Sequence, residues 1–545
     1  MNVHRRTVAW LAAVAMLAAV AGVAPLGAAE HTKTDTVVTS HDGTPIAVTV
    51  FKPATAGADT PVPMIMHSHG WGGSRTTAIS AFQAELDEGF GVLSFDQRGF
   101  GQTPGPANVQ DPELEGRDVI ALIDFIAGLD WVAKDVKPGV PANAAETAKG
   151  NTGHVGVRED AEVDPSDPVL FAMGLSYGGG YQFIGALTET RETGRTRFNA
   201  LAPEITWFDL ADSLAPAKVA RTAWISLLYA TGLQAHRQDI HAATAFGMAT
   251  GQWPDGTYPG IANIHDRFRA NSPVAFVEDG KHLDVPVLIG QGSSDNLFNL
   301  NQGVRNFEIT LTDAARAKSL FVGYNGGHAL PNVLPPGYPA DVQVGGNADP
   351  CSQPAGGFGK LRRDFFRAVI AGENPRALLG AGQAYHVATA DGVCVHTDSV
   401  AANTELVAAA APGLPSAAVT TTGAGAPQHL HLAAGPLRVA GVPVLEADVT
   451  TVGADQRVFF GLSVGETPAT ARVVHNNLLP LRELLPIVRE GRVLELAGMA
   501  VDVPAGQHLY LTVSPLSDMY FGHGSTRTPG AVTLENIRVR VPVQP

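Results

Sequence analysis

The pentapeptide Gly174-Leu175-Ser176-Tyr177-Gly178 places a serine between two glycines, with the apolar run "PVLFAM" before it and the helix-like "YQFIGALT" after it. This context is typical of a nucleophile elbow, in which a turn too sharp for large flanking residues lifts the serine Oγ clear of a sheet. A structural turn of small residues is the alternative. A serine hydroxyl is a good nucleophile only when a base takes its proton. The hypothesis therefore requires a base and an acid elsewhere in the chain.

Asp295 and His328 supply these groups in the chain order serine, acid, histidine. Asp295 follows the strand-like "DVPVLIGQG", and His328 follows the strand-like "KSLFVGYN". Loops at the ends of such strands meet at one edge of an α/β sheet, so we expect both side chains beside Ser176. His328 would take the serine proton, and Asp295 would orient the imidazole and stabilise its cation. A turn-capping aspartate and an ordinary loop histidine are the alternatives. Asp279 and Asp284 are rival acids, but they precede the strand.

Acyl transfer also needs hydrogen-bond donors for the negative charge that develops on the carbonyl oxygen. We predict the backbone N–H of Tyr177 as one donor and the backbone N–H of Trp71, in "HSHGWGG", as the other. Gly70 would allow the close turn before Trp71. His69 precedes the serine in the chain, so we expect a structural role for it.

Asp96 and Arg98 stand in the conspicuous segment "DQRGFG". Buried charges have to be paired, so we interpret them as a structural ion pair that shapes the loop below the site. Gly174 and Gly178 are expected to be structural as well, because they flank the nucleophile.

Residues 30–400 alternate short apolar runs with helical patterns, which predicts an α/β fold with a mostly parallel sheet. Residues 217–280 have no clear strand pattern and are expected to form a helical insertion. Residues 401–428 are low in complexity and indicate a linker. In residues 429–545 the apolar period changes to two, which is typical of an antiparallel sandwich.

Residues 1–29 have the composition of a signal peptide: Arg5 and Arg6, then an apolar run, then small residues at 27–29. An uncleaved membrane anchor is the alternative, since the run is almost long enough to span a bilayer. We expect cleavage, a secreted protein and no stable membrane span afterwards. In an oxidising compartment the only two cysteines, Cys351 and Cys394, would form a disulfide; two buried free thiols are the alternative.

The composition argues against other classes of function. The formal net charge is −15, and no long run of Lys and Arg is present, so a nucleic-acid partner is not expected. His429 and His431 share a strand face, but two imidazoles without a further ligand are weak evidence for a metal. We expect neither a metal nor an organic cofactor.

The segments "SHGWGG", "DQRGFGQTPG", "GLSYGGG", "SSDNLF" and "GGHALP" occur in this order. Together they resemble the X-Pro dipeptidyl-peptidase and cocaine-esterase group of α/β-hydrolases. The C-terminal segments "LEADVTTVGADQRVFFGLSVG" and "PAGQHLYLTVSP" resemble the jelly-roll domain of that group. The resemblance implies an α/β-hydrolase domain with a helical cap, a C-terminal jelly-roll sandwich, and a secreted serine hydrolase that acts on ester or amide bonds.

Two departures from that group matter for the substrate. The cocaine-esterase branch uses a tyrosine hydroxyl in the oxyanion hole, whereas Trp71 at the corresponding position offers only its backbone N–H. A dipeptidyl-peptidase needs an acidic group for the free amine of its substrate, and no such group is evident. We therefore expect a small-molecule ester substrate first and an Xaa-Pro peptide second. A non-catalytic extracellular binding protein is the alternative from another class.

Overall fold

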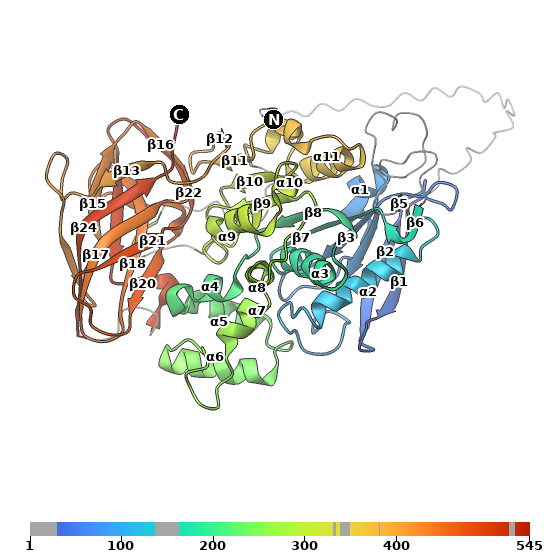
Figure 1. Cartoon of the computed structure of the whole chain (residues 1–545), viewed down its shortest axis with the longest axis horizontal. Coiled ribbons are helices and arrows are strands. Elements are labelled where there is room, and N and C mark those ends of the chain that lie inside the picture. Colours follow the sequence, from blue (N-terminus) through green and yellow to red (C-terminus); the bar gives the residue numbers. More distant parts are fainter. Residues whose placement is uncertain (1–29, 137–162, 331–333, 338–348, 381, 523–528) are drawn as a thin grey trace, which may run out of the picture.

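The computed structural model describes residues 30–136, 163–330, 334–337, 349–380, 382–522 and 529–545. Figure 1 shows an α/β body beside a sandwich of strands formed by the C-terminal part of the chain. The predicted signal peptide lies outside the described residues. Across the ranges that are described, no helix is both long enough and apolar enough to cross a membrane.

The α/β body is built on a ten-stranded sheet with the order β1-β2-β4-β3-β7-β8-β9-β10-β11-β12. The strands from β4 to β11 run parallel, and antiparallel pairs close both edges. The strands are β1 Thr32–Thr39, β2 Pro45–Lys52, β3 Met64–Ser68, β4 Gly91–Phe95, β7 Leu170–Leu175, β8 Phe198–Glu204, β9 Leu288–Gly292, β10 Leu320–Tyr324, β11 Tyr385–Ala388 and β12 Cys394–Thr397. A short hairpin, β5 Lys134–Val136 and β6 Val163–Pro168, lies apart from this sheet.

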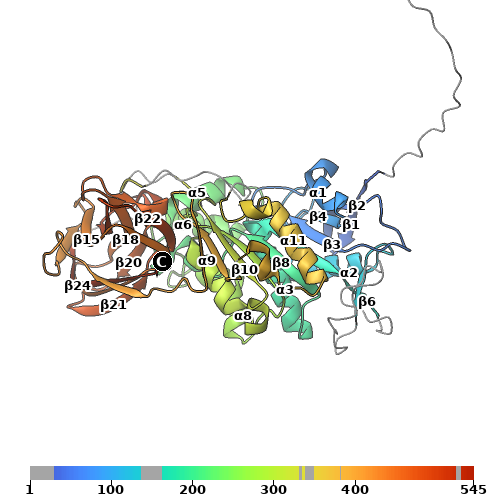
Figure 2. The same cartoon turned by 90° about the horizontal axis from the view of Figure 1, so that it is seen from above.

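Helices cover both faces of the sheet, which is why its central strands are continuous apolar runs. Residues of α2 (Glu115–Ala127) and α3 (Tyr177–Thr193) belong to one buried cluster. Residues of α1 (Gln83–Asp87) and α11 (Phe358–Ile370) belong to another. Figure 2 shows α3 and α11 beside β8, which both helices contact. The mostly parallel α/β-hydrolase sheet predicted from the sequence is confirmed.

Helices without strands form the insertion that follows β8. They are α4 Leu210–Leu214, α5 Thr222–Thr231, α6 Gln238–Thr250, α7 Ile264–Ala270 and α8 Pro273–Glu278. Two short helices, α9 Leu300–Arg305 and α10 Asp313–Arg316, then separate β9 from β10. Tryptophans and other apolar side chains of the insertion share one buried cluster with Tyr177 and Phe298 of the α/β body. The insertion is therefore a cap packed over the region that follows Ser176.

The C-terminal part is a sandwich of antiparallel sheets. One has the order β13-β24-β17-β21 with β14 also on β24, one has β15-β23-β18-β19 with β20 also on β18, and a smaller one has β22-β16-β25. The strands are β13 Thr404–Val407, β14 Val419–Thr422, β15 Gln428–Ala434, β16 Leu437–Gly441, β17 Val444–Val452, β18 Gln456–Gly465, β19 Arg472–Val473, β20 Leu479–Glu483, β21 Glu490–Glu495, β22 Met499–Val503, β23 His508–Ser514, β24 Ala531–Val541 and β25 Val543–Gln544. The predicted period of two is visible in β17, where buried and partly exposed residues alternate.

The structure corrects the interpretation of residues 401–428 as a linker. They contain β13 and β14, which both pair with β24 of the sandwich. Each of these strands has only four residues, most of them small or polar, so the sequence shows little apolar signal for a strand. Their pairing depends on the longer strand β24. The predicted disulfide is present: Cys351 and Cys394 are joined, with their Cα atoms 5.0 Å apart.

Candidate active site

Ser176 stands at the turn between β7 and α3 with a left-handed backbone, φ 58° and ψ −120°. An L-residue rarely adopts this conformation, and it persists only where the surroundings enforce it. Here the Ser176 N–H donates to the Glu204 carbonyl at 2.9 Å. The Ser176 carbonyl accepts from the N–H groups of Gly179 and Gly180 at 2.8 and 3.0 Å. The turn therefore has the backbone geometry of a nucleophile elbow.

Two of the three predicted glycines are required by close packing. A Cβ at Gly178 would overlap the Ser68 carbonyl, and a Cβ at Gly174 would lie 2.9 Å from that same oxygen. Gly70 differs, because a Cβ there would make only ordinary contacts at 3.8 Å with Leu175 O and Ser176 Cβ. The expectation that Gly70 is needed for a tight turn is thus not met. Its position nevertheless places the Gly70–Trp71 segment beside Ser176.

Asp295 and His328 are in direct contact, as predicted from their strand-end positions. Asp295 Oδ2 accepts from the backbone N–H of His328 at 3.0 Å and lies 2.7 Å from His328 Nδ1. Its Oδ1 accepts from the N–H groups of Leu297 and Phe298 at 2.9 and 2.6 Å. The carboxylate is fully buried. A buried carboxylate with four hydrogen bonds has one orientation, so it holds the His328 ring with Nδ1 toward it and Nε2 away from it.

The loop that carries His328 approaches Asp295 through a glycine. Gly327 has φ +102°, and a Cβ there would lie 2.7 Å from the Asp295 Cβ. The His328 ring then meets the edge of Phe298 at 5.2 Å and the edge of Trp224 at 5.8 Å between centroids. Phe298 and Ser176 both line one pocket. The histidine thus contacts Phe298, a side chain of the cavity wall to which Ser176 also belongs.

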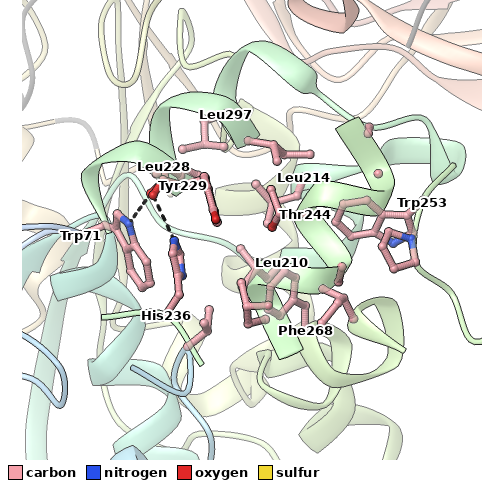
Figure 3. A pocket seen from close by; sticks show the side chains of 18 of the residues that line it. Trp71, Leu210, Leu214, Leu228, Tyr229, His236, Thr244, Trp253, Phe268 and Leu297 are labelled. Atoms are coloured by element: carbon pink, nitrogen blue, oxygen red, sulfur yellow. Dashed lines mark hydrogen bonds between the residues drawn. The ribbon is translucent and has the colours of Figure 1, made fainter. Parts of the chain in front are cut away.

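That pocket lies between the sheet and the cap and encloses about 1000 Å³ of space, part of it open to solvent. Figure 3 shows its wall, with Trp71 and His236 on one side, Trp253 on the other and Phe268 at its base. Most of the wall comes from the cap, including Leu210, Leu214, Ile225, Leu228, Ile240 and Met248. Of the described residues that line the pocket, none is an Asp, Glu, Lys or Arg. The cavity is therefore suited to an uncharged, apolar group.

His236 is the one histidine among these lining residues. Its pKa is lowered from 6.5, mainly by burial, so the ring is neutral at pH 7. Its Nε2 lies 3.2 Å from the Tyr229 carbonyl, which can only accept. The ring therefore adds a polar atom to the wall but no charge.

Trp71 joins the predicted oxyanion segment to the cap. Its indole N–H donates to the Leu228 carbonyl of α5 at 2.9 Å (Figure 3). Its ring also meets the edge of Tyr177 at a centroid distance of 5.0 Å. The indole is thus engaged with the cap, which leaves the backbone N–H as the oxyanion donor we predicted. Tyr177 begins α3, where the first amide groups of a helix have no partner within the helix. Burial raises the pKa of the Tyr177 hydroxyl well above its usual value, so it stays protonated.

The predicted ion pair between Asp96 and Arg98 does not form. Asp96 pairs with Arg75 and accepts from the Gln102 N–H at 2.9 Å. Arg98 pairs with Asp118 at 2.6 Å and with Asp42 at 2.7 Å. Residues two apart share a face only in an extended strand, and β4 ends at Phe95, so the two side chains diverge. Both are still buried ion-pair members below the site.

The other three histidines considered in the sequence analysis, His69, His429 and His431, have structural partners. His69 Nε2 accepts from the Gln97 N–H at 3.2 Å, and its Nδ1 lies 2.8 Å from the Gly70 carbonyl. His429 lies 3.0 Å from the Thr512 hydroxyl, and His431 lies 3.1 Å from His508. These contacts agree with the structural role expected for His69.

Among the residues that the structure describes, one group has metal-ligating atoms within 4.8 Å of one another: His386, Cys394 and His396. Cys394 is held in the disulfide, and the two imidazoles lie 2.6 Å apart at their Nδ1 atoms as a hydrogen-bonded pair. The cluster therefore offers no thiolate to a metal in this oxidised form.

Sequence reasoning missed Asn296, which follows the acid. It accepts from the indole N–H of Trp224 at 2.7 Å, donates to the Leu330 carbonyl at 2.8 Å and donates its own N–H to the His328 carbonyl at 3.0 Å. It thereby ties the cap to the histidine loop. The feature of the sequence that could have identified Asn296 is its place in "SSDNLF", directly after Asp295. The apolar cap residues of the pocket gave no such signal, because buried core residues have the same composition.

This combination of a mostly parallel sheet, a serine elbow and an acid–histidine pair at the ends of later strands defines an α/β-hydrolase. A family model described as X-Pro dipeptidyl-peptidase (S15 family) matches residues 42–329, which is more than half of the 545 residues. The chain belongs to this family and is a hydrolase of the esterase or peptidase type.

Solved structures share the fold over nearly the whole chain. A CocE/NonD family hydrolase from Staphylococcus aureus matches with a TM-score of 0.62 and 12% identity, over 94% of each chain. An aminopeptidase from a marine sediment Thaumarchaeota archaeon matches with a TM-score of 0.58 and 12% identity, over 96% of this chain and 98% of the other. An alpha-amino acid ester hydrolase matches with a TM-score of 0.56, 12% identity and the same coverage. No curated protein sequence matches the chain.

Proposed function

We propose that this protein is a serine hydrolase that cleaves carboxylic esters with an uncharged, apolar acyl group through an acyl-enzyme. Ser176 is the nucleophile, His328 the general base and acid, and Asp295 the residue that orients the imidazole. The observation that carries the proposal is the position of Ser176 on a strained elbow at the wall of an apolar pocket. His328, which the buried Asp295 holds, contacts Phe298 of the same wall.

In this mechanism the Ser176 hydroxyl attacks the ester carbonyl while His328 Nε2 accepts its proton. The carbonyl oxygen becomes an oxyanion, for which the backbone N–H groups of Tyr177 and Trp71 are the donors. The tetrahedral intermediate collapses, and the alcohol leaves with the proton returned by His328. Water then attacks the acyl-enzyme by the same route, releasing the acid and restoring the Ser176 hydroxyl.

The uncharged wall supports an acyl group without a free amine. A protonated amine that leaves water requires a carboxylate partner, because an isolated buried charge is strongly disfavoured. None of the described lining residues is acidic, and His236 is neutral. Burial of an apolar group contributes about 25 cal/mol for each Å² removed from water, so this wall favours larger apolar acyl groups over acetyl.

The family match favours a second candidate, an Xaa-Pro dipeptidyl-peptidase. The two candidates separate on a panel of p-nitrophenyl esters of increasing acyl length and of Xaa-Pro chromogenic amides. For the esterase we expect kcat/KM to rise from acetate to longer acyl chains and the amides to stay near background. Faster turnover of the amides would reverse the ranking of the two candidates.

Replacing the nucleophile tests the mechanism itself. We expect Ser176→Ala to lower kcat by roughly 10⁶-fold, the scale of loss when a serine nucleophile of this kind is removed, with an unchanged melting temperature. A fluorophosphonate probe should label the wild-type protein and not the variant. Labelling of the folded variant, or wild-type activity in it, would exclude Ser176 as the nucleophile. A folded wild-type protein that stays unlabelled and hydrolyses nothing would instead leave a binding protein as the alternative.

We also propose that residues 1–29 direct export. The charge and apolar pattern of that segment supports this, and so does the disulfide, since disulfides persist in oxidising compartments. N-terminal sequencing of the protein from the medium and from membranes tests it. A mature chain that begins near Glu30 is expected, whereas an intact Met1 confined to membranes would indicate an anchor.

A further inference from the structure

The β-sandwich contacts the loop that carries the proposed catalytic acid. Asn477 Nδ2 donates to the Asp295 carbonyl at 2.9 Å, and His475 Nδ1 lies 3.0 Å from the Ser294 hydroxyl. Both sandwich residues are buried, with exposed fractions of 3% and 2%. The sandwich therefore touches Asp295 itself and the residue before it.

The Asp295 carbonyl belongs to the peptide group that joins Asp295 to Asn296. The N–H of that same peptide group donates to the His328 carbonyl at 3.0 Å. Because a peptide group is planar and rigid, Asn477 on one side and the histidine loop on the other fix its orientation. Rotation of this plane would turn the Asp295 Cα and with it the carboxylate that holds the imidazole.

The sandwich segment that makes these contacts has an unusual backbone. His475 and Asn476 both have φ 55°, in the left-handed region, although neither is glycine. Such conformations cost free energy and persist where the surroundings determine them. Here His475 Nε2 is held at the backbone of Ala500, 3.1 Å from its nitrogen and 2.9 Å from its carbonyl oxygen. The strained turn brings Asn477 to the acid loop.

The sandwich also contacts the chain that follows His328. The Val473 N–H donates to the Pro336 carbonyl at 3.0 Å, and the Asp518 N–H donates to the Leu334 carbonyl at 3.2 Å. The Asp518 carboxylate in turn accepts from the Leu334 N–H at 3.2 Å. The acid and histidine loops are therefore both bonded to the same domain.

We propose that residues 473–477 of the β-sandwich are a positioning element for the hydrolytic site, in which Asn477 holds the Asp295 peptide group so that the carboxylate stays aligned with His328. This inference rests on the function proposed above. Asn477 is a positioning residue, since it acts through Asp295 and touches no reacting atom. The β-sandwich then helps to position the hydrolytic site in addition to packing against the α/β body.

Replacing Asn477 tests the proposal. Because misplacement of a catalytic group by about 1 Å can lower a rate by roughly 100-fold, we expect Asn477→Ala to lower kcat by about ten-fold and to leave KM within about two-fold. Asn477→Ser keeps a hydroxyl donor and should recover part of that loss. The assay uses the full chain and a p-nitrophenyl ester, with the melting temperature of each variant.

Asn301→Ala is the matched control. Asn301 is also a buried asparagine that bonds the two domains, accepting from the Gly498 N–H at 2.6 Å and donating to the Leu496 carbonyl at 3.0 Å. Its side chain makes these bonds outside the acid loop, so this variant should keep the wild-type kcat even if its melting temperature falls. Equal losses of kcat in the two variants would overturn the proposal, because domain docking alone would then account for them.

A double variant separates positioning from general damage. In an Asp295→Asn background the effect of Asn477→Ala on kcat should vanish, since the group it positions is absent. A full additional ten-fold loss there would overturn the inference. Wild-type kcat in Asp295→Asn alone would instead overturn the proposed function. Should Asn477→Ala fail to fold, Asn477→Ser carries the same comparison, with a several-fold loss expected where Asp295 is intact and none in the Asp295→Asn background.

Discussion

At the scale of single residues, the site depends on one buried carboxylate. Asp295 accepts two hydrogen bonds on each oxygen, from Leu297 and Phe298 on Oδ1 and from the backbone and ring of His328 on Oδ2. An asparagine amide in place of this carboxylate would direct its N–H groups toward one of these donor pairs, where an acceptor is needed. The ring of His328 would then lose both its orientation and its preferred tautomer.

We therefore expect Asp295→Asn to lower kcat by about 10⁴-fold, the scale seen when the acid of such a triad becomes an amide, while the protein remains folded. Asp284→Asn is the control. Asp284 is one of the two rival acids from the sequence, but it is exposed, precedes the N-terminal end of β9 and accepts from the Thr312 hydroxyl at 2.5 Å. Steady-state kinetics and melting curves distinguish the two, and a larger loss in Asp284→Asn would refute our choice of acid.

At the scale of elements, the position of Ser176 depends on how closely α3 approaches β3. A Cβ at Gly178 would overlap the Ser68 carbonyl and lie 3.1 Å from the His69 carbonyl. Neither obstacle is the flexible end of a side chain, so the helix or the strand has to move. The glycine thus sets the distance between the first turn of α3 and the end of β3, where the oxyanion segment begins.

Gly178→Ala should accordingly lower the free energy of unfolding by about 1–3 kcal/mol, the usual range for overpacking in a dense core, and slow labelling by a fluorophosphonate. Gly70→Ala is a control for stability, because a Cβ there makes only ordinary contacts at 3.8 Å. Differential scanning calorimetry provides the comparison. A larger destabilisation in Gly70→Ala would show that the close approach at Gly178 is not what determines the packing.

At the scale of the whole molecule, we expect the contact between the two domains to weaken in acid. His475 is buried where the sandwich meets the acid loop, and burial lowers its pKa to about 4 from an ordinary value of 6.5. The unfolded chain therefore binds a proton that the folded chain does not bind between these values. The stability that neutral His475 contributes is complete above about pH 6.5 and is lost as the pH falls toward 4.

We expect His475→Gln to melt below the wild type at pH 7.5, because it loses contacts with Ser294 and Ala500. The deficit should shrink as the pH falls from 6.5 toward 4, by up to about 3 kcal/mol, since the variant has no buried imidazole to protonate. The comparison uses the difference between the two proteins because Glu115, whose pKa burial raises to about 8, acts in the opposite direction in both. A deficit that grows with acid would contradict this account.

The α/β order, the serine elbow and the contact between Asp295 and His328 could all be predicted, because each has a local signature. An apolar run followed by Gly-x-Ser-x-Gly or by a glycine-rich turn identifies a strand end, and parallel strand ends share one edge of the sheet. The prediction that Asp96 pairs with Arg98 failed because it relied on a local feature alone. Their closeness in the chain carried no information about Arg75, Asp118 and Asp42, which come from other elements.

By itself, the sequence determined the elements and the strand ends at which Ser176, Asp295 and His328 stand, because hydrophobic period and glycine placement act over a few residues. Only the tertiary structure decided what surrounds them. The uncharged wall of the pocket, the place of β13 and β14 in the sandwich and the bond from Asn477 to Asp295 each join segments distant in the chain. Such contacts depend on how buried surfaces pack against one another. This packing produces no periodic pattern in the sequence of either segment.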